Sequence, residues 1–75
     1  MTPHQCKAAR AMLDLSQEQL GKLSGVATST IIPFEANQRN PYKSTIDKLR
    51  SSLEEAGVQF IEENGGGPGV RLRKP

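Results

Sequence analysis

The sequence offers few residues for redox, metal or disulfide chemistry. Cys6 is its one cysteine, His4 is its one histidine, and it has no tryptophan. One cysteine cannot form an internal disulfide, and with one histidine it supplies too few ligands for a structural zinc site. We therefore expect no metal and no cofactor. We expect Cys6 to pack in the core, with redox sensing as the alternative, and His4 to lie at the surface.

Long apolar runs are also missing. No stretch approaches the ~20 apolar residues that cross a bilayer, and the first residues lack the charged start and apolar stretch of a secretory signal. Hydrophobic residues make up 35% and charged residues 24% of the chain, a balance typical of globular proteins. These features predict a cytoplasmic protein that makes no membrane contact.

The sequence also lacks a recognisable catalytic grouping. No nucleophile stands beside a plausible base, and the acidic residues read as ordinary solvent-facing charges: Glu54, Glu55, Glu62 and Glu63. We therefore expect no enzyme activity. The net charge of +2 and the isoelectric point near 9.0 permit a polyanionic partner, although many proteins carry such a charge without binding one.

The length of 75 residues indicates one domain, which spans residues 1–75. A domain this small buries only roughly 60% of the surface that its unfolded chain exposes. Its margin of stability is therefore narrow, and a second copy of the chain can add the apolar burial that one small core lacks. Self-association is an expectation from size alone.

Capping boxes mark the beginnings of two helices. Thr2 to Gln5 combines a Thr cap, a Pro at the first helical position and a Gln at the third, and Ser16 to Gln19 repeats the Ser/Gln pair. The second helix should end near Ser24, because Gly25 suits the left-handed conformation that stops a helix. The first should run to about Leu13, with a core-facing stripe at helical spacing: Cys6, Ala9, Met12 and Leu13.

Two further helices are predicted downstream. A short third helix covers residues 27–35 and turns Ile31 and Phe34 inward. A fourth opens at Ser44 and stops at Gly57. Its apolar stripe is Ile46, Leu49, Leu53 and Ala56.

Beyond Gly57 the apolar period changes from helical to alternating. Val58 and Phe60 share one face of a first strand, and Val70 and Leu72 share one face of a second. The glycine-rich stretch 64–69 between them fits a hairpin connection. The predicted fold is therefore mainly α, with about four helices in residues 4–56 and a C-terminal β-hairpin in residues 57–75.

Gly21 stands in the middle of the second helix, where glycine costs about 1 kcal/mol relative to alanine. Close packing against the third helix is a plausible reason for it. Two short helices joined by a glycine turn form a motif that inserts its second helix into the major groove of DNA.

The ordered motifs of this region resemble the Cro and cI repressor type of helix-turn-helix domain, also called the XRE family. The matching segments are Leu15 to Leu20, Gly25-Val26, Thr30-Ile31, Phe34-Glu35 and Arg39 to Pro41. The resemblance covers roughly residues 4–56. It implies a fold like that of lambda repressor and a double-stranded DNA partner.

The resemblance also implies roles for individual residues. Base contacts would come from Gln17, Thr28, Ser29 and Pro33, and contacts to the DNA backbone from Thr30, Asn37, Arg39, Asn40 and Lys43. Amides and hydroxyls suit these contacts because they donate to phosphate oxygens and to base edges. The alternative is that the polar side chains are solvated cap residues and that Arg39 and Lys43 are solvated charges.

Pro33 departs from the family pattern. A proline inside a helix loses a backbone hydrogen bond and clashes with the carbonyl of the residue four positions earlier, here Ser29. We expect the third helix to be kinked or shortened there. Pro33 either presents its ring to a thymine methyl or marks a domain that no longer reads DNA; the polar residues retained around it favour the first.

The hairpin is the candidate dimer interface, because an isolated hairpin is marginally stable and leaves strand edges open to pairing. The predicted contacts are Val58, Phe60, Ile61, Val70 and Leu72. The alternative is that the hairpin only caps the core of one copy. The expected function is a repressor or autoregulator that binds a palindromic operator as a homodimer; the other candidate is an antitoxin or interaction module whose C-terminal part binds a partner protein.

Overall fold

The computed structural model describes residues 1–74, and its order of elements is the one that the sequence predicts. The helices are α1 (Pro3–Met12), α2 (Gln17–Ser24), α3 (Thr28–Glu35) and α4 (Lys43–Ala56), and the strands are β1 (Val58–Ile61) and β2 (Gly69–Leu72). The mainly helical fold with a C-terminal hairpin is confirmed. No helix within residues 1–74 has the length and apolar character needed to span a bilayer.

Both predicted capping boxes are formed. The Thr2 hydroxyl accepts from the Gln5 backbone N–H at 3.1 Å, and the Gln5 side chain accepts in return from the Thr2 backbone N–H at 2.8 Å. Ser16 and Gln19 make the same reciprocal pair at 3.0 and 2.8 Å. Gly25 ends α2 with a φ of 74°, in the left-handed region that glycine adopts without strain. The capping boxes therefore fix where α1 and α2 begin, and Gly25 turns the chain between α2 and α3.

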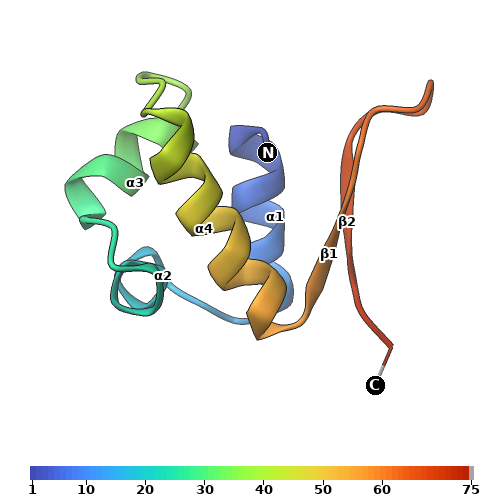
Figure 1. Ribbon diagram of the computed structural model, residues 1–75, viewed down its shortest axis with the longest axis horizontal. Coiled ribbons are helices and arrows are strands. Elements are labelled where there is room, and N and C mark those ends of the chain that lie inside the picture. Colours follow the sequence, from blue (N-terminus) through green and yellow to red (C-terminus); the bar gives the residue numbers. More distant parts are fainter. Residues whose placement is uncertain (75) are drawn as a thin grey trace.

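The helices and the hairpin enclose one hydrophobic core. Figure 1 shows α2 and α3 on one side of α4, with α1 behind it and the hairpin standing alongside on the far side from α3. The buried apolar side chains come from every element except β2: Cys6, Ala9, Leu20, Val26, Ile31, Phe34, Leu49, Leu53, Val58 and Phe60. The core therefore joins α2 and α3 to the hairpin in a single packing unit.

Four details of the helix predictions are wrong. Met12 is 42% exposed, because it lies in the last turn of α1 and borders an open groove toward the hairpin. Ala56 is exposed in the last turn of α4. That helix begins at Lys43 rather than Ser44, after Tyr42, whose side chain makes no capping bond. Helix α3 continues past Pro33 to Glu35, so of the expected kink or shortening at Pro33 the shortening does not occur.

The hairpin is fastened to the helices at several points. Val58 pairs with Leu72 and Phe60 with Val70 in an antiparallel register. The Gln5 side-chain amide, buried on α1, donates to the carbonyls of Ile61 at 3.2 Å and Gly69 at 2.9 Å. These bonds hold both strands against the first turn of α1.

This packing limits which of the predicted dimer contacts a second copy can reach, although the dimer itself stays a prediction. Val58 is fully buried and Phe60 is 6% exposed, so both side chains belong to the core of their own copy and are not available to a partner. Ile61 and Val70 are half-buried, and Leu72 is 55% exposed. The apolar side chains that the hairpin can still offer are therefore these three.

Gly21 is placed where α2 crosses the start of α3. A Cβ at this position would lie 3.0 Å from the Val26 carbonyl oxygen and 3.3 Å from the Thr28 hydroxyl. The first contact is to backbone, which cannot swing aside as a flexible side chain can. The close packing inferred for Gly21 therefore agrees with the structure.

Gly21→Ala is expected to destabilise the fold, although alanine is the better helix former by about 1 kcal/mol. Crowding in a packed region costs about 1–3 kcal/mol, so we expect a net loss of about 1 kcal/mol and a drop in Tm of about 5 °C. Thermal unfolding followed by circular dichroism measures it. Gly66→Ala is the control, because its added Cβ would meet only the Asn64 side chain at 3.6 Å; an equal drop in both variants would contradict the crowding argument.

Candidate nucleic-acid interface

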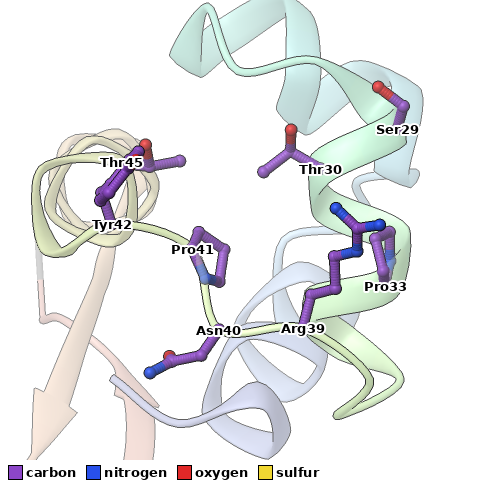
Figure 2. Close-up of a pocket in the computed structure, with 8 residues that line it drawn as sticks. All are labelled: Ser29, Thr30, Pro33, Arg39, Asn40, Pro41, Tyr42 and Thr45. Carbon is purple, nitrogen blue, oxygen red and sulfur yellow. The ribbon is translucent and has the colours of Figure 1, made fainter.

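A groove lies between α3 and the beginning of α4. It has a volume of about 430 Å³ and is lined by Ser29, Thr30, Pro33, Arg39, Asn40, Pro41, Tyr42 and Thr45. Figure 2 shows the α3 side chains along one wall, the Arg39–Pro41 loop across the floor, and Tyr42 and Thr45 on the opposite wall. Hydroxyl, guanidinium and amide groups from three segments therefore border one open surface.

Helix α3 is anchored along one face and open along the other. Ile31 and Phe34 are buried at 0% and 2% exposure, in the positions predicted for them. On the other face Ser29 and Ile32 are exposed, and Pro33 is half-buried. The helix is therefore held rigidly from within while its outer surface stays accessible to a ligand.

The loop after α3 is tied to the end of the same helix. Asn37 has a φ of 59°, a left-handed conformation that asparagine tolerates better than most residues. The backbone N–H groups of Gln38 and Arg39 then both donate to the Pro33 carbonyl, at 2.8 and 3.2 Å. This reversal brings Arg39 back beside α3, into the groove that Pro33 lines.

A buried carboxylate connects α3 to the two preceding helices. Glu35 is 3% exposed and forms a two-pronged ion pair with Arg10 of α1, with N–O distances of 2.6 and 2.8 Å. The Cys6 thiol donates to the same carboxylate at 3.1 Å, and the Gln17 amide donates to it at 3.0 Å. Arg10 also donates to the Leu15 carbonyl at 3.0 Å. This cluster, the Glu35 cluster, fixes α3 relative to α1 and α2.

The Glu35 cluster controls the ionisation of its members. Burial acts to raise the pKa of Glu35, but the hydrogen bonds from Arg10, Cys6 and Gln17, with the positive charge of Arg10, outweigh it and hold that pKa below its usual value. Burial, reinforced by the neighbouring carboxylate, raises the pKa of the Cys6 thiol. Cys6 is fully buried, as expected from its place in the apolar stripe, and its raised pKa keeps it a neutral thiol.

The structure brings together five of the nine residues for which DNA contacts are predicted. Ser29, Thr30, Pro33, Arg39 and Asn40 all line the groove. The other four lie outside it and are described in turn below. None of these placements tests contact with DNA, so the assignments stay predictions.

Gln17, Thr28, Asn37 and Lys43 are the four that lie outside the groove. Gln17 uses one amide hydrogen on Glu35, and Thr28 packs beside Gly21. Asn37 borders a separate hollow next to the start of α1. The exposed Lys43 pairs with Asp47 at 3.1 Å, an arrangement close to the solvated-charge alternative.

Sequence reasoning missed two groups of residues at this surface. Tyr42, which is 86% exposed, and Thr45 form the wall opposite α3. The sequence did contain a signal for Tyr42 and Thr45. The first turn of a helix that follows the Arg39–Pro41 loop must lie next to that loop. Ile32 was also missed, although its exposure of 48% on the open face follows from the inward positions of Ile31 and Phe34.

A model of the helix-turn-helix family matches residues 7–55, which is more than half of the chain and includes α2, α3 and the groove. The chain belongs to the helix-turn-helix family of the Cro and cI type. It is therefore a DNA-binding transcription regulator in the general sense of that family. A search among curated proteins found no match.

In this helix-turn-helix protein, Glu35→Gln is expected to cost about 2–4 kcal/mol of unfolding free energy at pH 7, because it leaves the largely buried Arg10 without its counter-ion. The lowered pKa of Glu35 means that its contribution is present above the ordinary carboxyl pKa of about 4.3 and is lost as the pH falls through the lower, folded-state value. The difference in unfolding free energy between the variant and the wild type should therefore be smaller at about pH 3 than at pH 7.

Urea unfolding at the two pH values measures this gap. Glu62→Gln is the matched control, because Glu62 pairs with Arg50 at 3.0 Å on the surface, with 73% of its side chain exposed. Its cost should stay below about 1 kcal/mol. A Glu35→Gln penalty that does not change with pH would contradict the assignment of the stabilisation to the ionised carboxylate.

Proposed function

We propose that the protein represses transcription by occupying a palindromic operator as a homodimer, with α3 in the major groove of each half-site. The observation that carries this proposal is the open face of α3 and the groove beside it. A rigidly anchored helix is the element that enters a major groove in this class of motif. The groove supplies polar groups along one side of that helix.

The residues at the groove differ in chemistry, and this supports different roles for them: some suit phosphate contacts and others suit base contacts. Arg39 offers a guanidinium for phosphate, and Thr30 and Asn40 offer neutral donors. Ser29 and Pro33 face outward from α3 itself and are suited to base edges. Gln17 is bonded to Glu35 through one amide hydrogen and keeps the other for a phosphate or base contact.

Dimer formation is proposed through the hairpin. The sheet has two strands, so each strand leaves one edge without a strand neighbour within the described residues. Leu72 is the most exposed apolar side chain of the two strands, and the half-buried Val70 lies on the same face two positions earlier. The half-buried Ile61 pairs with Gly69 and adds apolar surface on the other face. The hairpin stands away from α3 (Figure 1), so pairing through it leaves both reading helices free for DNA.

The first experiment is selection of genomic fragments that the protein retains, followed by salt-titrated binding of the best duplex and of its scrambled version. We expect a site with two-fold symmetry that is bound about 10³-fold or more tightly than the scramble. Equal binding to both duplexes with a steep dependence on salt would indicate phosphate attraction alone. Either that result or no binding at all contradicts the proposal.

Arg39→Ala refines the same experiment. We expect weaker binding to specific and scrambled duplexes by a similar factor, and a salt slope reduced by about one ion, because one phosphate contact is removed. Lys7→Ala is the control. It removes the same charge from an exposed position on α1, outside both the groove and the hairpin, and should leave the affinity nearly unchanged.

The interface is tested by Leu72→Glu. Sedimentation equilibrium should show dimer dissociation shifted by about tenfold or more, because a charge would be buried between copies. Tm measured at low protein concentration should hardly change, since Leu72 is 55% exposed in one copy. Ser51→Glu, at an exposed position on α4 beside Ser24, is the control outside the hairpin; if Leu72→Glu dimerises as the wild type does, the interface lies elsewhere.

A further inference from the structure

The open face of α3 is unusual in what its side chains can do. The eight residues of the helix include no lysine, arginine, asparagine or glutamine, and the one charged residue, Glu35, is buried in the Glu35 cluster. The outward positions carry two hydroxyls, on Thr28 and Ser29, and then apolar groups on Ile32 and Pro33. The helix therefore lacks the forked donors that distinguish guanine or adenine through paired hydrogen bonds.

Hydroxyl groups cannot make up for this lack. A serine or threonine hydroxyl both donates and accepts, so it contacts more than one base without strong preference. The apolar groups are different, because the major groove presents one apolar feature, the 5-methyl group of thymine. A surface of aliphatic carbon gains free energy on contact with that methyl and gains little from the other base edges.

Ile32 is the largest apolar side chain on this face. It is 48% exposed and adjoins Pro33, so the two give the outer surface of α3 an apolar portion. Its spacing of three and four residues from Ser29 and Thr28 puts it on the same side of the helix as both. Pro33 follows directly and lines the groove.

We propose that Ile32 is a specificity-determining residue, and that α3 selects its operator by contact with 5-methyl groups on pyrimidines. The inference rests on the proposed function, since it assumes that α3 lies in the major groove. It names the feature of the base that α3 detects. The proposal also predicts that α3 recognises 5-methylcytosine, because 5-methylcytosine carries the same methyl group at the same place in the groove as thymine.

The test begins with the operator duplex selected above, in which each dT is replaced singly by dU. This change removes one methyl group and leaves the hydrogen-bonding edge intact. At the position facing Ile32 we expect affinity to fall about fourfold, the factor that corresponds to about 0.8 kcal/mol for one buried methyl-sized group. Other thymines, outside the contact, should tolerate dU without change.

A second series separates methyl contact from hydrogen bonding at the sensitive position. Replacement of the T·A pair by C·G removes the methyl and also exchanges the acceptor O4 for the donor N4. Replacement by 5-methyl-dC·dG restores the methyl alone. We expect the methylated pair to recover about fourfold in affinity over the unmethylated one.

Ile32→Ala assigns the effect to one side chain. The variant should bind the dT and dU duplexes equally and should fold normally, because the side chain is half exposed and alanine favours helix. Met12→Ala is the matched control. Met12 is 42% exposed on α1, in a groove toward the hairpin rather than on α3, and its loss should leave the dT/dU ratio unchanged.

The outcomes separate this inference from the function on which it rests. A fourfold ratio that disappears only in Ile32→Ala supports the proposal. Specific binding with no dU effect at any position overturns methyl recognition and leaves the proposed function standing. A ratio that persists in Ile32→Ala overturns the role of Ile32, and failure to bind any operator specifically overturns the proposed function itself.

Discussion

The carboxylate of Glu35 stands on α3 and accepts hydrogen bonds from two side chains of α1 and one of α2, so three helices meet at a single buried charge. Removing a carboxylate from water is costly, and the cost is offset only when its oxygens are fully bonded and paired with a cation. Arg10, Cys6 and Gln17 meet that condition only in one relative arrangement of the helices. The orientation of the reading helix therefore depends on satisfying this group.

The same cluster links the inside of the domain to its outside. Gln17 contacts Glu35 from the first turn of α2 and is only partly buried, so its side chain reaches from the cluster to the surface. On α3, Ser29 before the buried Ile31, and Ile32 and Pro33 between Ile31 and the buried Phe34, form the open face. Core-facing and outward-facing residues thus alternate along one short helix. A shift or rotation of α3 that altered its outer surface would also disturb its packing in the core.

Local signals made much of the fold predictable from sequence. The capping boxes at Thr2 and Ser16 and the left-handed Gly25 depend on residues a few positions apart, so a linear reading finds them. Gly21 was interpretable because a mid-helix glycine requires a reason. The burial of Phe60 and the exposure of Met12 were not predictable, since both depend on where the hairpin settles against α1.

The candidate site also combines residues that the sequence predicts with contacts that only the folded packing creates. Arg39 and Pro33 were named from their places in the motif, and the structure puts both in one groove. The engagement of Gln17 with Glu35 escaped prediction, because residues 17 and 35 are joined only by the packing of α2 on α3. Tyr42 was missed because it belongs to no helix face and is defined only by the loop that precedes it.

The position of Phe60 in the core has a consequence for how the protein is made. The four helices are synthesised first, yet their core is closed by Val58 and Phe60, which leave the ribosome later. A chain that stopped after α4 would leave apolar surface of α1 and α4 uncovered and would have a smaller margin of stability, which is the condition that exposes a protein to degradation. The last strands to be made are therefore needed to complete the core of the helices that precede them.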